Sequence, residues 1–289
     1  MKILNFGSLN IDHVYSVSHF VKPGETLSSQ TYEIFSGGKG LNQSIGLAKA
    51  GAEIYHAGKI GGDGMFLIEM LKKVEVDYEN ITISDIATGH AIIQVNAEGE
   101  NSIILYGGAN QAINKDEVDT VFKKFQAGDT LLLQNEISQA AYIMQTAKKK
   151  KMTIIFNPAP MSPKVQDLPL DVVDIFILNE LEGEELSGIR EPKKMLLALK
   201  KRFPRALSIL TLGSKGAQFL RGNETVTVPA HKVDVVDTTA AGDTFIAYFT
   251  EAYTKGSGIK TAIQKANKAA ALSVTIKGAA NSIPFAMDL

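Results

Sequence analysis

The stretch "TLLLQNE" (Thr130–Glu136) is followed by "SQAAYIMQTAKKKK" (Ser138–Lys151) and "MTIIFNP" (Met152–Pro158), and this order of elements decides the fold. The first and third segments are short apolar runs, typical of strands buried on both faces, and the second has the spacing of an amphipathic helix. The alternation continues through "VDIFILNE", "LEGEELSG", "PKKMLLALKKRF" and "LSILTLG". It predicts an α/β fold, with a Rossmann-like, mostly parallel sheet flanked by helices.

Two segments of the first half have a different pattern. Near residues 10–35 and 89–107, apolar and polar residues approach strict alternation, with turns that contain Gly, Pro or Asn. This period is typical of strands exposed on one face. We therefore predict that both segments form a small β-sheet lid on one domain that spans residues 1–289.

The composition excludes several classes of protein. The 289 residues are 45% apolar and 21% charged, with a net charge of −1, so the chain lacks the basic surface typical of nucleic-acid binding. No segment has the apolar length of a membrane span, and the N-terminus reads as a first strand and not as a signal peptide, so a cytoplasmic location is expected. The chain has no cysteine, and its five histidines show no metal-ligand spacing.

Neither of the common nucleotide-binding motifs occurs. The chain has no G-x-x-x-x-G-K-[ST], and "NFGSLNID" stands where a G-x-G-x-x-G motif would follow the first strand. Polar residues nevertheless follow the predicted strands or open helices: Asn10, Asp12, Lys39, Asn42, Glu136, Asn179, Glu182 and Thr211. Each alone is explained as a turn former, helix cap or solvated helix end. Together they predict one ligand site at the carboxyl ends of the strands.

The stretch "VDTTAAGDTF" (Val236–Phe245) places three tiny residues before Asp243 and an apolar helix. A helix N-terminus opened by small residues leaves backbone N–H groups and the positive dipole end in reach of an anion. Asp243 then acts as a base beside that anion, or simply caps the helix.

These motifs resemble those of the ribokinase, or PfkB carbohydrate kinase, family. "SGGKGLNQS" (Ser36–Ser44) and "DTTAAGDTF" (Asp237–Phe245) are similar to the two family signatures. The resemblance extends over the whole chain, through "GSLNID", "NAEGEN", "NPAP", "LNELEGEEL", "TLGSKG" and "VTIKGAANSIP". It implies an ATP:sugar phosphotransferase with a ribokinase-like fold and a lid that contributes to a homodimer.

The resemblance assigns roles around the phosphoryl transfer. Asp243 is expected to be the catalytic base, and Ala240, Ala241 and Gly242 to form the anion hole. Many family members have glycine where this chain has Ala240. The residues expected to bind the sugar are Asn10, Asp12, Gly38, Lys39, Asn42, Glu136 and Asp243.

The resemblance also implies ATP, Mg²⁺ and K⁺ as cofactors. The residues expected on the nucleotide side are Asn179, Thr211, Gly213, Gly216, Gly242 and Asn267, with Glu182 ordering Mg²⁺ through water. The other explanation of Asn179 and Glu182 is an acidic first turn of a helix. The residues that match the family's K⁺ site are Asp237, Thr239, Ser273, Ile276, Gly278 and Ser282.

The sequence alone does not decide which molecule accepts the phosphoryl group. D-ribose is the expected sugar, because Asp12, Lys39 and Asn42 favour a small furanose with many hydroxyl groups. Deoxyribose, another pentose, fructose or a nucleoside such as adenosine is the alternative. The lid residues Ile92, Gln94 and Ile104 are candidates to face it. A non-catalytic sugar sensor is a third hypothesis, which the presence of Gly242 and Asp243 disfavours.

Overall fold

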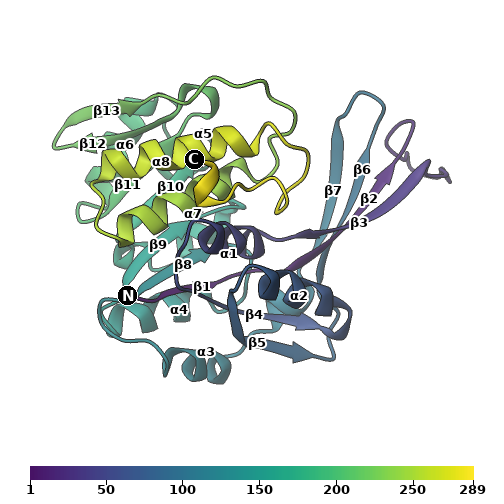
Figure 1. Cartoon of the computed structure of the whole chain (residues 1–289), viewed down its shortest axis with the longest axis horizontal. Helices are drawn as coiled ribbons and strands as arrows, with labels where there is room; N and C mark the ends of the chain where they lie inside the picture. Colours follow the sequence, from purple (N-terminus) through teal and green to yellow (C-terminus); the bar gives the residue numbers. More distant parts are fainter.

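A nine-stranded sheet forms the centre of the molecule in the computed structural model, which describes residues 1–289 (Figure 1). The strand order is β13-β12-β11-β10-β9-β8-β1-β4-β5. The strands are β1 (Ile3–Phe6), β4 (Ile54–Gly61), β5 (Asp77–Ser84), β8 (Thr130–Gln134), β9 (Thr153–Asn157), β10 (Ile175–Asn179), β11 (Leu207–Thr211), β12 (Ala217–Arg221) and β13 (Glu224–Val228). All pairs from β5 to β11 are parallel, and only the pairs β11–β12 and β12–β13 are antiparallel. The predicted fold class is confirmed.

Helices cover both faces of this sheet. On one face lie α1 (Lys39–Lys49), α2 (Met65–Lys73), α7 (Ala241–Thr254) and α8 (Ile259–Ser273), and on the other α3 (Lys115–Phe122), α4 (Ala140–Lys149), α5 (Glu180–Ser187) and α6 (Pro192–Arg202). Successive strand residues supply the two faces in turn: Leu132 packs with the first set of helices, and Leu131 and Leu133 with the second. No helix has both the length and the apolar character that crossing a membrane requires.

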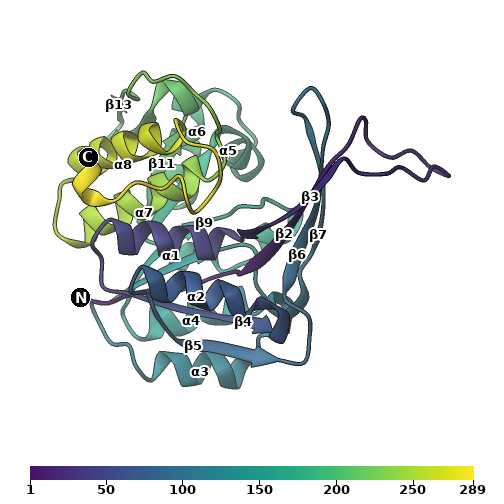
Figure 2. The same ribbon diagram turned by 45° about the vertical axis from the view of Figure 1, so that its right-hand side comes forward.

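Four further strands form a separate sheet that projects from the body (Figure 2). Its order is β3-β2-β6-β7, with β2 (Asn10–Ser16), β3 (Thr31–Gly37), β6 (Gly89–Val95) and β7 (Asn101–Tyr106). The expectation of exposure on one face was wrong for β7, since Ile103 and Ile104 point to opposite faces and are 54% and 64% exposed. It was also wrong for most of β3, where the successive residues Ile34 and Phe35 are 53% and 43% exposed. The reason is that this sheet extends beyond the helices, so neither face of β7 is covered within the chain.

Two glycines bring the N-terminus of α1 directly onto the end of β1. A Cβ on Gly40 would lie 2.4 Å from Ser8 N, and a Cβ on Gly7 would lie 2.6 Å from Gly40 Cα. Such distances are too short for any side chain, so both positions require glycine. The contact is continued by a hydrogen bond from Leu41 N–H to Ser8 O at 2.9 Å. The first turn of α1 is thereby fixed beside the segment that connects β1 in the body to β2 in the four-stranded sheet.

Candidate active site

The first turn of α7 forms the centre of the candidate site. Ala240, directly before the helix, has a left-handed backbone with φ of 59°, and its carbonyl accepts a hydrogen bond from Thr244 N–H at 2.8 Å. The N–H groups of Gly242 and Asp243 follow, where an α-helix has no carbonyl for them and where its dipole is positive. A Cβ on Gly242 would meet nothing within 4 Å. This turn therefore has the room and the polarity to receive an anion.

Two amides of α1 hold the Asp243 carboxylate, which is only 7% exposed. Asn42 Nδ2 donates to Oδ2 at 3.0 Å, and Gln43 Nε2 donates to Oδ1 at 2.9 Å. One donor on each oxygen fixes the plane of the carboxylate. Asn42, expected to contact the sugar, thus contacts the acid through its NH₂ group, and its Oδ1 accepts no hydrogen bond within the chain.

A cavity of about 230 Å³ opens beside this acid, at the carboxyl ends of β9, β10 and β11. It brings together residues from distant parts of the sequence: Lys39, Asn157, Asn179, Glu182, Thr211, Ala240, Gly242 and Asp243. A larger hollow of about 530 Å³ at the start of α4 contains none of them. The smaller cavity is the candidate site, because it combines the buried acid with the open helix N-terminus.

Lys39 is the positive charge of this cavity. The neighbouring carboxylate of Asp243 raises the pKa of Lys39 above its ordinary value, burial opposes this, and Glu136 and Glu182 add to the rise. The ammonium group is therefore charged at neutral pH. A half-buried lysine among three acids can pair with a phosphate that enters between them.

Asn179 and Glu182 form a capping box at the start of α5. Asn179 Oδ1 accepts from Glu182 N–H at 2.9 Å, and the Glu182 carboxylate accepts from the N–H of Asn179 at 3.0 Å and from its Nδ2 at 2.9 Å. Burial raises the pKa of Glu182 above the ordinary range. The simple capping explanation is thus correct for the local contacts, and the pair also lines the cavity.

Asn10, Asp12 and Glu136 lie on the side of the site next to the small sheet. Burial, and after it the charge of Glu136, raises the pKa of Asp12 to about 6. A Cβ on Gly37 would lie 2.3 Å from the Asp12 carboxylate. The neighbouring strand β3 therefore has room for this carboxylate only because residue 37 is glycine. Glu136 accepts hydrogen bonds from Lys39 N–H at 2.9 Å and from the Ser8 hydroxyl, and so caps the first turn of α1. Gly38, with φ of 93°, is the residue before that turn.

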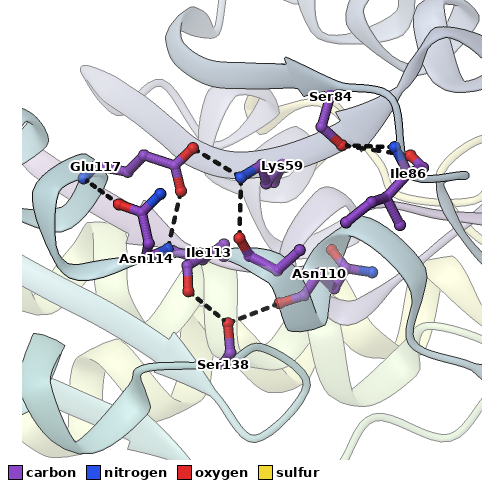
Figure 3. Close-up of polar contacts among 9 residues, drawn as sticks. Lys59, Ser84, Ile86, Asn110, Ile113, Asn114, Glu117 and Ser138 are labelled. Atoms are coloured by element: carbon purple, nitrogen blue, oxygen red, sulfur yellow. Dashed lines mark hydrogen bonds and ion pairs between the residues drawn. The ribbon is translucent and has the colours of Figure 1, made fainter.

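A polar cluster fixes the orientation of Asn10 through Asn110, and Figure 3 shows the part of this cluster around Asn110, Ser138, Lys59 and Glu117. Asn110, in the short helix η2 (Gly108–Ala112), donates from Nδ2 to Asn10 Oδ1 at 2.7 Å, which leaves the Asn10 NH₂ group to donate elsewhere. Ser138 holds η2 by its N–H, which donates to Asn110 O at 3.0 Å. Lys59 holds the same helix through Ala112 O at 2.9 Å and pairs with Glu117 at 2.8 Å.

The register of the small sheet shows which side chains share the face of Asp12. Ala91 lies beside Asp12 on β6, and Leu105 lies opposite Ala91 on β7. Ile92, Gln94 and Ile104, the candidates from the sequence, are one residue out of this register and point to the other face. The face of Asp12 therefore presents Ala91, Phe35, Ile93, Ile103 and Leu105.

Three of the residues assigned to the nucleotide lie outside the cavity lining: Gly213, Gly216 and Asn267. Gly213 has φ of 54° in the turn after β11. Asn267 donates from Nδ2 to the carbonyls of Val228 and Pro229, both at 3.0 Å, and a Cβ on Gly216 would lie 2.1 Å from Val228 O. Gly216 and Asn267 therefore meet at the end of β13, where both fix the backbone. Thr211 donates to Leu178 O at 3.1 Å and does line the cavity.

The residues assigned to a potassium ion lie in two segments, one before α7 and one at and after the end of α8. The Asp237 carboxylate joins them, because it accepts from the N–H of Thr239 and from the N–H of Gly278, both at 2.9 Å. Burial opposes ionisation, but the hydrogen bond from the Thr239 hydroxyl, together with these two N–H groups, lowers the pKa of Asp237 below its ordinary value. The buried hydroxyls of Ser273 and Ser282 donate to neighbouring carbonyls, and Ile276 belongs to the same segment.

Four residues of the site were not singled out in the sequence: Gln43, Asn110, Gln134 and Asn157. Gln43 is adjacent to a predicted residue, and Asn157 begins the "NPAP" motif. Gln134 ends an apolar strand, and a polar residue there was the one signal available. Asn110 gave no signal, since its role depends on contacts with Leu9 and Asn10, about one hundred residues earlier.

A buried carboxylate, an open helix N-terminus and a charged lysine around one cavity define an α/β phosphotransferase site. Residues 1–286 match the pfkB family of carbohydrate kinases, and the chain belongs to this family. The ribokinase of Staphylococcus aureus (strain COL) is 36% identical over 98% of this chain and 97% of its own length. The deoxyribokinase of Salmonella typhi is 31% identical over 98% and 96%. The structure of Arabidopsis thaliana ribokinase complexed with ribose and ATP has a TM-score of 0.88 and 31% identity, with 99% of this chain and 96% of that chain covered.

Proposed function

We propose that this carbohydrate kinase transfers the γ-phosphoryl group of ATP to D-ribose and forms ribose 5-phosphate. The observation that carries the proposal is the buried Asp243 carboxylate, held by Asn42 and Gln43 beside the open N-terminus of α7. The similarity to ribokinases over nearly the whole chain supports ribose as the acceptor. Deoxyribose is the second candidate, because a deoxyribokinase is similar over the same length.

Asp243 accepts the proton of the attacking sugar hydroxyl as the new O–P bond forms, while the bond from the γ-phosphorus to the β,γ-bridging oxygen breaks and ADP leaves. The N–H groups at the start of α7, together with the ammonium group of Lys39, stabilise the negative charge that develops on the transferred group. Asn10 donates to a sugar hydroxyl through its fixed NH₂ group, while Asp12 and Glu136 accept from others. The apolar face of the lid beside Asp12 excludes water from the transfer.

Two cations belong to this proposal. Mg²⁺ would neutralise phosphate charge when bound, and Glu182 would hold it through water, because Glu182 is an acidic residue of the cavity lining and Mg²⁺ keeps several of its waters. The residues of the proposed K⁺ site lie beside the start of α7, where the charged Asp237 joins the two segments. A cation there fixes the turn that carries Ala240.

Replacing the base tests the proposed chemistry. In Asp243→Asn, kcat for ribose is expected to fall by about 10²–10⁴-fold, because the amide accepts no proton. Asp234→Asn, an exposed acid on the preceding loop, is the matched control and keeps its activity. ADP release is measured with D-ribose, 2-deoxyribose, D-fructose, D-xylose and adenosine. Preference for another acceptor overturns the assignment of ribose. If the unaltered protein releases no ADP with any of these acceptors, the proposed kinase activity is overturned.

The raised pKa of Asp12 predicts pH-dependent sugar binding. Below its pKa of about 6 the protonated carboxyl group no longer accepts two hydroxyl groups, so ribose affinity is expected to weaken as pH falls from about 8 to about 5. Calorimetry measures this in the absence of nucleotide. Asp12→Asn is expected to bind ribose weakly at every pH. A pH dependence that persists in this variant assigns the effect to another group.

The proposed cation site predicts activation by K⁺. Activity is expected to rise several-fold with K⁺ and much less with Na⁺, and Asp237→Asn is expected to reduce the response, because it loses the charge that joins Thr239 to Gly278. Initial rates at constant ionic strength measure the effect. Equal activity in K⁺, Na⁺ and a bulky organic cation contradicts the site.

We also propose that the lid pairs with the lid of a second copy. The support is β7, a sheet edge on which Ile103, Ile104, Leu105 and Tyr106 are all more than half exposed. Replacing Ile103 and Ile104 with lysine is expected to convert a dimer into monomers in sedimentation experiments. The same change at Asn101 and Ser102 adds equal charge to both faces of the same strand and leaves the dimer intact. A monomeric unaltered protein contradicts this assembly.

A further inference from the structure

Three buried side-chain amides connect the backbone of α1 to Asp243. Asn5 lies on β1, Gln134 ends β8 and Gln43 lies on α1, and each is at most 1% exposed. Asn5 Nδ2 donates to Gly40 O at 2.8 Å, and Gln43 Nε2 donates to Asp243 Oδ1 at 2.9 Å. Between them, Gln134 Nε2 donates to Asn5 Oδ1 at 2.9 Å and to Gln43 Oε1 at 2.6 Å. We call these three amides the amide relay.

The polarity of the relay is set at one end. The carbonyl of Gly40 is an acceptor only, so Asn5 must present its NH₂ group to it and its Oδ1 to Gln134. Gln134 uses its NH₂ group for both Asn5 Oδ1 and Gln43 Oε1. Gln43 is then left with its NH₂ group facing Asp243 Oδ1. A reversed Gln43 would place two NH₂ groups against each other at Gln134 and two oxygens against each other at Asp243.

We infer that Gln134 and Gln43 are positioning residues for the base, and that the amide relay fixes the direction in which Gln43 donates to Asp243. The inference rests on the proposed role of Asp243. Gln43 and Asn42 together hold both carboxylate oxygens, so the remaining lone pairs keep a constant direction toward the cavity. A misplacement of a reacting group by about 1 Å is enough to lower a rate by about 10²-fold.

A side branch of the same network does not help to set the direction in which Gln43 donates to Asp243. Asn5 Nδ2 also donates to Ser44 Oγ at 2.8 Å, and Ser44 Oγ lies 2.7 Å from His56 Nδ1. Complete burial lowers the pKa of His56 to about 4, so the imidazole is neutral. Because Gly40 O alone orients Asn5, loss of the Ser44 hydroxyl leaves the relay unchanged. Ser44, with 0% exposure, is therefore a matched control of equal burial.

The test breaks the relay with Gln134→Glu. The side chain introduced by this change has no NH₂ group, so it no longer donates to Asn5 Oδ1 and Gln43 Oε1, and the direction in which Gln43 donates to Asp243 is no longer fixed. The expected result is a fall in kcat for ribose of about 10–100-fold, with the KM values for ribose and ATP within about threefold of the unaltered protein. Gln43→Met, which removes the donor at similar volume, is the second variant and is expected to lower kcat at least about tenfold with the same KM values.

Thermal unfolding separates positioning from stability. Ser44→Ala is expected to lower the melting temperature and keep kcat within about threefold, whereas the relay variants lose kcat at temperatures where they are fully folded. Unchanged kcat in Gln43→Met overturns the inference, as does a loss of kcat in Ser44→Ala equal to that of the relay variants. Full activity in Asp243→Asn instead overturns the proposed function, so the two failures are distinguishable.

Discussion

The contact between Gly7 and Gly40 is the constraint on which the site depends. Backbones approach this closely only without side chains, and here a Cβ on Gly7 would lie 2.6 Å from Gly40 Cα. The contact fixes the N-terminus of α1 against the end of β1, so Lys39, Asn42 and Gln43 all reach the same site. A shift of α1 would move the positive charge, both donors to Asp243 and the Gly40 carbonyl that orients the amide relay together.

The site collects more negative than positive side chains. Asp243, Glu136 and Glu182 all raise the pKa of Lys39, which is the one cation among them. A triphosphate adds further negative charge, so its binding requires positive potential from another source. The first turn of α7 supplies part of it through its N–H groups, and this explains why two bound cations belong to the proposed function.

The sequence was sufficient to predict a feature of the fold or the site wherever the physical cause of that feature was local. The open turn before Asp243 follows from small residues ahead of a helix, and the parallel sheet follows from apolar runs between amphipathic helices. The partners of Asp243 did not follow, because Asn42 lies 201 residues away and is brought there by helix packing. The sequence could not decide which lid residues share the face of Asp12, for a related reason. A shift of one residue exchanges Ile92 for Ala91, and only strand pairing fixes the register.

Sugar binding and lid position are coupled through one strand. Asn10 and Asp12, which we propose bind the sugar, belong to β2, and β2 is paired with β3 on one side and β6 on the other. A hydroxyl bound to Asp12 therefore restrains the central strands of the lid and, through β6, the edge strand β7. Asn110 fixes the point where β2 leaves the body, because it bonds to both Leu9 and Asn10. In the proposed function the sugar therefore acts on the four-stranded sheet from within that sheet, at the end that is anchored to the nine-stranded body.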